Sequence, residues 1–222
     1  MTEQTKKHSV VYALTGEALT PAVIRAGNQE TPVWMQQRWQ DGEFAMYIRN
    51  NGCGHCCAAM AARLYGVQLT PYTEYLHCRK LWGEPTEKQG HWLTTAGIVK
   101  VLNSLGVPAQ GFGVAQFGAK KATGHILSAL AAGKQVLFTS NPDHYPENPF
   151  SKGYHWVMAV SLQDDGTILI ANSSEKATTE GIQFVEPDAI EKALFVESTA
   201  PDEMTWGDPD RIYEGSGFII VG

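Results

Sequence analysis

Hydrophobic residues recur at helical spacing in the part of the chain that follows residue 50. This pattern predicts helices over 53–65, 71–82, 94–105 and 125–132. Glycines stand where the first, third and fourth of these helices should end, and a proline opens the second. The first part of this region is therefore expected to be mainly helical.

Short apolar runs separated by turn residues dominate the rest of the chain. The predicted strands are 8–15, 107–114, 135–139, 154–162, 167–171, 182–185 and 218–221. The tetrapeptide 163–166 should join two of them as a tight hairpin, and 187–195 should form a short helix. Helices that precede antiparallel strands predict an α+β fold.

Composition limits the classes of protein to consider. The chain has 222 residues, of which 43% are hydrophobic and 18% charged, so it can bury a sizeable core. We expect residues 1–49 to be an irregular lead-in packed on the core of a domain over 50–222. The net charge is −6 and no long Lys/Arg block is present, which argues against nucleic acid as a partner.

No apolar run approaches the length needed to span a membrane, and the apolar stretch near the N-terminus is too short for a secretory signal. The sequence as given therefore predicts a cytoplasmic protein, or a secreted one if a leader was removed. Three of the four cysteines, Cys53, Cys56 and Cys57, are crowded on one predicted helix, and the fourth is Cys78. This usage suits packed or reactive thiols in a reducing compartment.

Cys53 lies between two glycines at the start of the first predicted helix. With Asn51 as the N-cap, its sulfur would face free backbone N–H groups and the positive end of the helix dipole. Such a thiol should have a lowered pKa and be nucleophilic. His55, two residues further on, is expected at the solvent or at the rim of a cleft.

Two downstream residues complete a candidate site. His155 begins an apolar strand, and Asn172 lies seventeen residues later, across the hairpin. If the two face each other, the Asn oxygen can orient the imidazole, and the other ring nitrogen can serve as a base for the thiol. Each residue also has a plainer interpretation, as a buried strand histidine or a turn asparagine.

The run from Cys53-Gly54 to Met60, followed by Tyr65-Gly66, resembles the active-site helix of papain-like cysteine peptidases. The resemblance is closest to the bacteriocin-processing, double-glycine-leader peptidase group, and it covers about residues 50–172. It implies a papain-like α+β fold, with N-terminal helices packed on a C-terminal antiparallel sheet. It also implies a catalytic Cys53 with His155 as base and Asn172 as the orienting residue.

Two features depart from that family. The family usually has a Gln about six residues before the cysteine, donating to the oxyanion, and here that position is Tyr47. Asn50 or Asn51 can supply the donor, as can the backbone N–H of the nucleophile; Gln36 and Gln37 are further candidates. A transporter segment and a membrane anchor are not recognisable, so leader processing coupled to export is not implied.

The position of the nucleophile has alternatives. A papain-type Cys-Gly-x-Cys register would make it Cys56, and Cys57 has Asn51 six residues upstream. The flanking glycines and the spacing to Met60 favour Cys53.

Several functions fit these residues. The first is a thiol hydrolase that cleaves a peptide or another amide through an acyl-enzyme, with no metal or cofactor. The same residues would serve an acyl transferase of the transglutaminase or phytochelatin-synthase type, or a catalytically silent peptide-binding relative. A zinc module of Cys53, His55, Cys56 and Cys57, supplemented by His77-Cys78, is a further reading, although one helix turn cannot comfortably supply four tetrahedral ligands. The natural substrate and the oligomeric state stay open.

Overall fold

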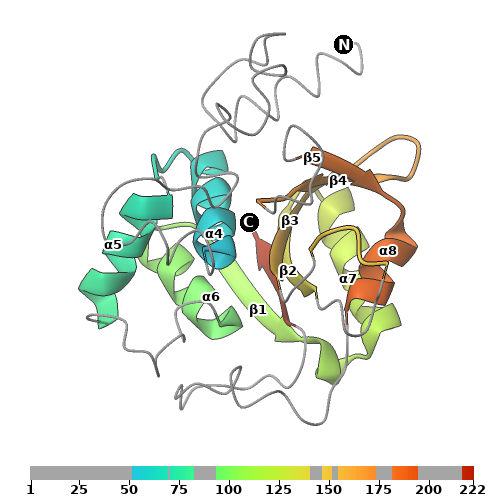
Figure 1. Cartoon of the computed structure of the whole chain (residues 1–222), viewed down its shortest axis with the longest axis horizontal. Helices are drawn as coiled ribbons and strands as arrows, with labels where there is room; N and C mark the ends of the chain where they lie inside the picture. The colour runs from blue at the N-terminus through green and yellow to red at the C-terminus, as the bar shows by residue number, and fades with distance from the viewer. Residues whose placement is uncertain are drawn as a thin grey trace, which may run out of the picture.

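The computed structural model describes residues 52–69, 71–82, 94–140, 147–151, 155–173, 182–194 and 217–222. Over these ranges the chain forms one six-stranded antiparallel sheet with helices packed on both faces (Figure 1). The α+β prediction is confirmed at this level. The predicted strand 8–15 and the lead-in 1–49 lie outside the described residues.

The sheet has the strand order β1-β6-β2-β3-β4-β5, and all neighbouring strands are antiparallel. The strands are β1 (Ala109–Gly113), β2 (Gln135–Ser140), β3 (His155–Leu162), β4 (Ile168–Ala171), β5 (Ile182–Val185) and β6 (Gly217–Val221). The last strand in sequence, β6, lies between β1 and β2. The C-terminal strand is therefore hydrogen-bonded to a neighbouring strand on each side.

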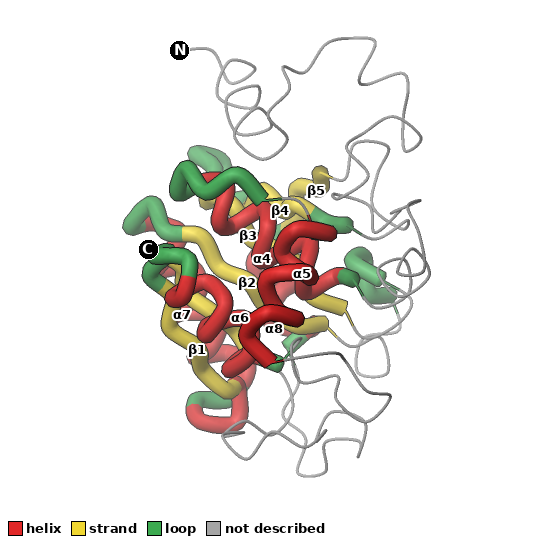
Figure 2. Tube along the Cα trace, turned by 90° about the vertical axis from the view of Figure 1, so that its left-hand side faces the viewer, coloured by secondary structure: helices red, strands yellow, loops and turns green. Residues whose placement is uncertain are grey.

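The helices divide between the two faces of the sheet, as Figure 1 shows, and Figure 2 gives a second view turned by 90°. The helices are α4 (Cys53–Leu64), α5 (Pro71–Trp82), α6 (Thr95–Ser104), α7 (Ala119–Ala131) and α8 (Pro187–Ala193), with a 3-10 turn η4 (Val114–Gln116) before α7. Helix α4 packs on β3 and against α5 and α6, whereas α7 packs on β2 and β3 and against α8. The sheet is thus the middle layer of three.

Residues of strand β3 contribute to two apolar clusters, one on each face of the sheet. Trp156, Met158 and Val160 belong to the apolar cluster that includes α4, while Val157 and Ala159 belong to the cluster that includes α7 and α8. Alternate residues of a strand point to opposite faces, so a continuous apolar run is what a strand covered on both sides requires.

Helix α4 is buried along most of its length, and its end is well defined. Every residue from Cys53 to Ala62 is buried, and apart from His55 and Met60 these side chains are small. Gly66 has φ 82° and follows the helix, and the Val67 N–H donates to the Ala62 carbonyl at 3.1 Å. This is a Schellman arrangement, and it confirms the prediction that the helix ends at Gly66.

Helix α7 begins earlier than the sequence pattern suggested. It starts at Ala119, after Gly118 in a positive-φ conformation (77°), and not at His125. Gly124, the residue before the predicted start, lies inside the helix. A glycine in a helix interior costs only about 1 kcal/mol relative to alanine, and the burial of Ala122 and Ile126 on one face of α7 offsets this.

The strand predicted over 107–114 is shorter than expected at both ends. Pro108 has no N–H to donate, so the ladder with β6 begins at Ala109. Val107 is instead buried in the α4 cluster, and Val114 opens the 3-10 turn.

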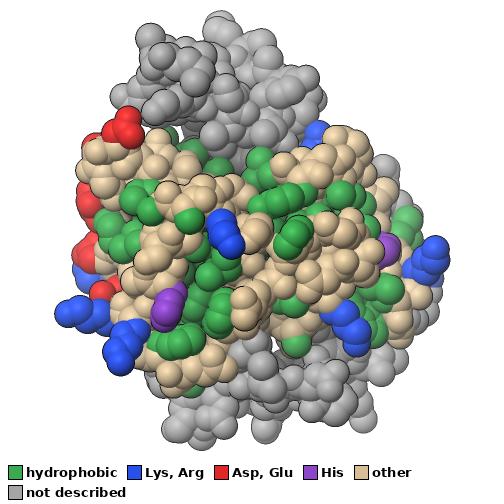
Figure 3. Space-filling view, turned by 180° about the vertical axis from the view of Figure 1, so that it is seen from behind, with side chains coloured by type: hydrophobic (Ala, Val, Ile, Leu, Met, Phe, Trp, Pro, Cys, Tyr) green, Lys and Arg blue, Asp and Glu red, His purple; other side chains and the backbone are tan. Residues whose placement is uncertain are grey.

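The surface formed by the described residues carries apolar, basic and acidic side chains. On the face shown in Figure 3, apolar side chains occupy several small patches, and basic side chains are dispersed among them. None of the helices that the structure describes is long and apolar enough to cross a membrane.

Candidate functional site

Cys53 is the first residue of α4, as the sequence predicted, and its side chain is almost fully buried. The N-cap residue is Gly52, whose carbonyl accepts from the Cys56 N–H at 2.9 Å, and no side chain caps the helix. The prediction that Asn51 is the N-cap is therefore wrong by one position. Asn50 and Asn51, the candidate oxyanion donors, lie outside the described residues.

The sulfur of Cys53 faces three backbone N–H groups. They are its own N–H, that of Gly54, and that of Trp156 on β3. The Trp156 N–H belongs to the peptide bond that joins Trp156 to His155, so the start of α4 lies against the start of β3. Two segments about 100 residues apart in the sequence are brought together at this point.

Burial raises the pKa of the Cys53 thiol above its ordinary value, and the three backbone N–H groups offset this only in part. The expected lowering of the Cys53 pKa is therefore wrong for this arrangement. Removing a thiolate from water costs more than a few backbone dipoles return. At neutral pH the resting Cys53 is a thiol and needs a base to become nucleophilic.

His155 and Asn172 meet as the sequence predicted. Asn172 donates from Nδ2 to the carbonyl of Phe150 and to Oε1 of Gln183, each at 2.9 Å. Its Oδ1 is therefore an acceptor, and the His155 Nε2 atom lies 2.9 Å from it. The imidazole must carry its hydrogen on Nε2, which leaves Nδ1 as the nitrogen that can accept a proton.

A β-bulge decides that these two side chains share a face. Between β3 and β4, Ser161 pairs with Leu169 but Met158 pairs with Ala171, so the register shifts by one residue. Continued past Ala171, this register places Asn172 on the same face as His155. Without the bulge, Asn172 would face the opposite side of the sheet.

Burial also lowers the pKa of His155, to about 4, and the hydrogen bond to Asn172 opposes this effect only in part. Asn172 has no charge to stabilise an imidazolium. The imidazole is therefore neutral at physiological pH, as a general base must be. In the resting protein both the Cys53 thiol and the His155 imidazole are therefore neutral, and the side-chain partner of His155 among the described residues is Asn172.

Gln183 is a site residue that sequence reasoning missed. It accepts from Asn172 and donates from Nε2 to the Pro149 carbonyl at 2.9 Å, so it fixes the amide of Asn172. Its only sequence signal is that it is the one polar residue in the short strand β5.

The alternative nucleophiles Cys56 and Cys57 are both fully buried. Cys57 lies in the apolar cluster between α4 and the sheet, and burial together with the neighbouring thiols Cys53 and Cys56 raises its pKa well above the ordinary value. Cys53 alone of the three retains some exposure.

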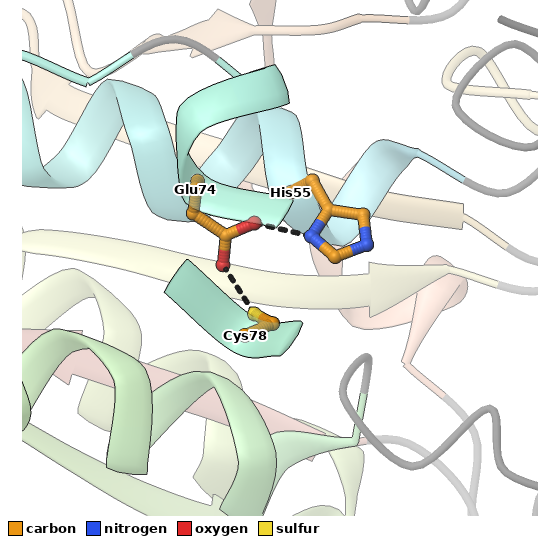
Figure 4. Close-up of polar contacts among 3 residues, drawn as sticks. All are labelled: His55, Glu74 and Cys78. Atoms are coloured by element: carbon orange, nitrogen blue, oxygen red, sulfur yellow. Dashed lines mark hydrogen bonds and ion pairs between the residues drawn. The ribbon is translucent and has the colours of Figure 1, made fainter. Parts of the chain in front are cut away.

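His55 is not at the surface, contrary to expectation. It is fully buried, and its Nδ1 contacts Oε2 of Glu74 on α5 (Figure 4). The other carboxylate oxygen, Oε1, accepts from the Cys78 thiol at 3.2 Å. His77, by contrast, is hydrogen-bonded to Ser104 on α6 at 2.9 Å.

Comparison with known proteins does not assign the chain to a family. No protein-family model matches the chain, and no curated protein matches its sequence.

Proposed function

We propose that this protein is a papain-like thiol enzyme that attacks the acyl carbon of a peptide or another amide. One observation carries the proposal. The Cys53 sulfur lies beside the peptide bond between His155 and Trp156, and the His155 imidazole is held by Asn172 in the tautomer that a base needs. The resemblance of the Cys53 helix to that of papain-like peptidases agrees with this geometry.

The chemistry follows from the protonation states. In the proposed step the Cys53 sulfur bonds to the acyl carbon while the thiol proton passes to His155 Nδ1. The two atoms have to approach each other in the substrate complex, and no stable ion pair has to precede attack. The proton then passes to the leaving amine, and the acyl group stays on Cys53 as a thioester. Water, activated by the same imidazole, releases the acid and restores the thiol.

Backbone N–H groups at the start of α4 are suited to the negative charge that develops on the acyl oxygen. The Cys53 and Gly54 N–H groups lie in the first turn of α4, beside the Cys53 sulfur, and the helix dipole favours an anion there. They can supply oxyanion stabilisation, to which Asn50 or Asn51 would add.

The test is acylation by an activated ester of a short peptide, followed by intact mass and peptide mapping. We expect one acyl group on Cys53 in the wild type, none in Cys53→Ala, and a rate at least about 10²-fold lower in His155→Ala. Cys57→Ala is the matched control, because it removes a neighbouring thiol from the same helix without touching the proposed nucleophile.

Adding an amine such as glycinamide to the acylated protein separates two fates. Release of the free acid supports a hydrolase, and release of the amide supports an acyl transferase. Acylation of His155→Ala at the wild-type rate would overturn the proposal. It would favour the alternative hypothesis of a catalytically silent peptide-binding protein.

A further inference from the structure

A second buried polar cluster lies in the interface between α4 and α5. It consists of His55, Glu74 and Cys78, hereafter the α4–α5 cluster. His55 is two residues from Cys53, which is about 200° around a helix, so its side chain leaves α4 on nearly the opposite side. The cluster is therefore separate from the proposed catalytic site and does not depend on the function proposed for it.

The donor atoms of this cluster converge from two helices. Glu74 and Cys78 are four residues apart, which places them on one face of α5, and His55 approaches from α4 (Figure 4). The three side chains are buried, and their ligand atoms all lie within 4.8 Å of one another. Tetrahedral zinc with nitrogen, oxygen and sulfur ligands separates those atoms by roughly 3.5 Å, so small side-chain rotations are enough to close the site.

The three residue types are those that zinc prefers, namely imidazole nitrogen, carboxylate oxygen and thiolate sulfur. Their charges also fit a divalent cation. A thiolate, a carboxylate and a neutral imidazole together balance two positive charges, so the filled site is neutral, as a buried site should be. The Cys78 proton passes to solvent when the metal binds.

We infer that the α4–α5 cluster is a binding site for one zinc-type transition metal ion, with Glu74 and Cys78 from α5 and His55 from α4 as ligands. The fourth position of the tetrahedron is left to water or another donor. Bound metal would fix α5 to the helix that carries Cys53. The expectation of a metal-free protein is revised by this inference, and the ligands are not the one-helix set considered from the sequence.

The experiment uses the full-length protein without an affinity tag, stripped with chelator and titrated with cobalt(II). We expect one cobalt per chain, a thiolate-to-cobalt charge-transfer band and the visible bands of tetrahedral cobalt. Zinc(II) should displace the cobalt and remove the bands. At a free zinc concentration 100 times the Kd, the free energy of unfolding should rise by about 2.7 kcal/mol.

Matched variants show whether the ligands are the right ones. Cys78→Ala should lose the charge-transfer band, whereas Cys57→Ala, which removes another fully buried thiol, should keep it. His55→Gln, chosen to retain a hydrogen-bonding group beside Glu74, should weaken cobalt binding at least tenfold while the circular dichroism of the wild type is kept. No band in folded wild type, or an undiminished band in Cys78→Ala, would overturn the inference.

Discussion

The two histidines that are buried among the described residues, His155 and His55, differ in the partner that each one has. His155 is paired with an amide, Asn172, whereas His55 is paired with a carboxylate, Glu74. An amide orients an imidazole without adding charge, and the buried ring therefore stays neutral and basic. A buried carboxylate, in contrast, needs hydrogen-bond donors or a cation beside it, and His55 and Cys78 lie against the carboxylate oxygens of Glu74.

The comparison indicates that burial alone does not define the role of a histidine. The His155–Asn172 pair lies at the ends of two strands, and the peptide bond between His155 and Trp156 lies beside the start of α4. The α4–α5 cluster lies between two helices, with its donor atoms directed toward one another. The His155–Asn172 pair suits proton transfer. The α4–α5 cluster suits a hydrogen-bonded contact between two helices or a metal ion.

The largest expected effect on stability comes from removing the Glu74 carboxylate that lies beside His55. In chelator, Glu74→Leu should lower the free energy of unfolding by about 3 kcal/mol, because it leaves the buried His55 without its carboxylate. Urea denaturation measures this loss. Lys192→Ala is the control, since it breaks the exposed Lys192–Asp188 pair (2.8 Å) and should leave the unfolding midpoint unchanged. Equal midpoints for Glu74→Leu and wild type would show that the α4–α5 cluster contributes nothing to stability.

The second prediction concerns pH and His155. The unfolded chain binds a proton at this histidine more readily than the folded protein does. The contribution of His155 to stability is therefore complete above its ordinary pKa of 6.5 and is lost as the pH falls from there toward 4. Relative to His155→Gln, which does not titrate, the wild type should lose about 3 kcal/mol over this window. A constant difference between the two proteins would mean that His155 has an ordinary pKa.

A smaller effect is expected at Asn172. Asn172→Ala should reduce the rate of Cys53 acylation by about 10-fold to 100-fold, because the imidazole loses the acceptor that sets its orientation and tautomer. Asn172→Asp keeps an oxygen acceptor and should restore part of the rate. It should also move the acid limb of the pH–rate profile upward, since a carboxylate favours the imidazolium. A purely structural role would leave that limb in place.

The smallest effect should come from Gln183. Gln183→Leu removes the groups that hold the Asn172 amide and the Pro149 carbonyl, and acylation should slow by about threefold to tenfold. The rate should be read beside the urea midpoint of the same variant. An unchanged rate would show that Phe150 alone is sufficient to position Asn172.

The sequence predicted much of the fold because local rules decide much of it. Pro71 at the start of α5, Thr94 as the N-cap of α6 and Gly66 after α4 act within a few residues of their own positions. The hairpin before β4 follows from Gly166, which has φ 88°. The start of α7 was missed because tertiary packing outweighed the local cost of Gly124.

The sequence by itself identified Cys53, His155 and Asn172 as candidates, because a chemical type and a position at the end of an element can be read from the chain. Only the tertiary structure decided the rest. The bulge in β3 sets the face of Asn172, and burial sets the pKa directions of the thiol and the imidazole. The placement of His55 against Glu74 depends on how α4 and α5 pack. Register, solvent exposure and helix contacts arise between distant segments, and no local pattern records them.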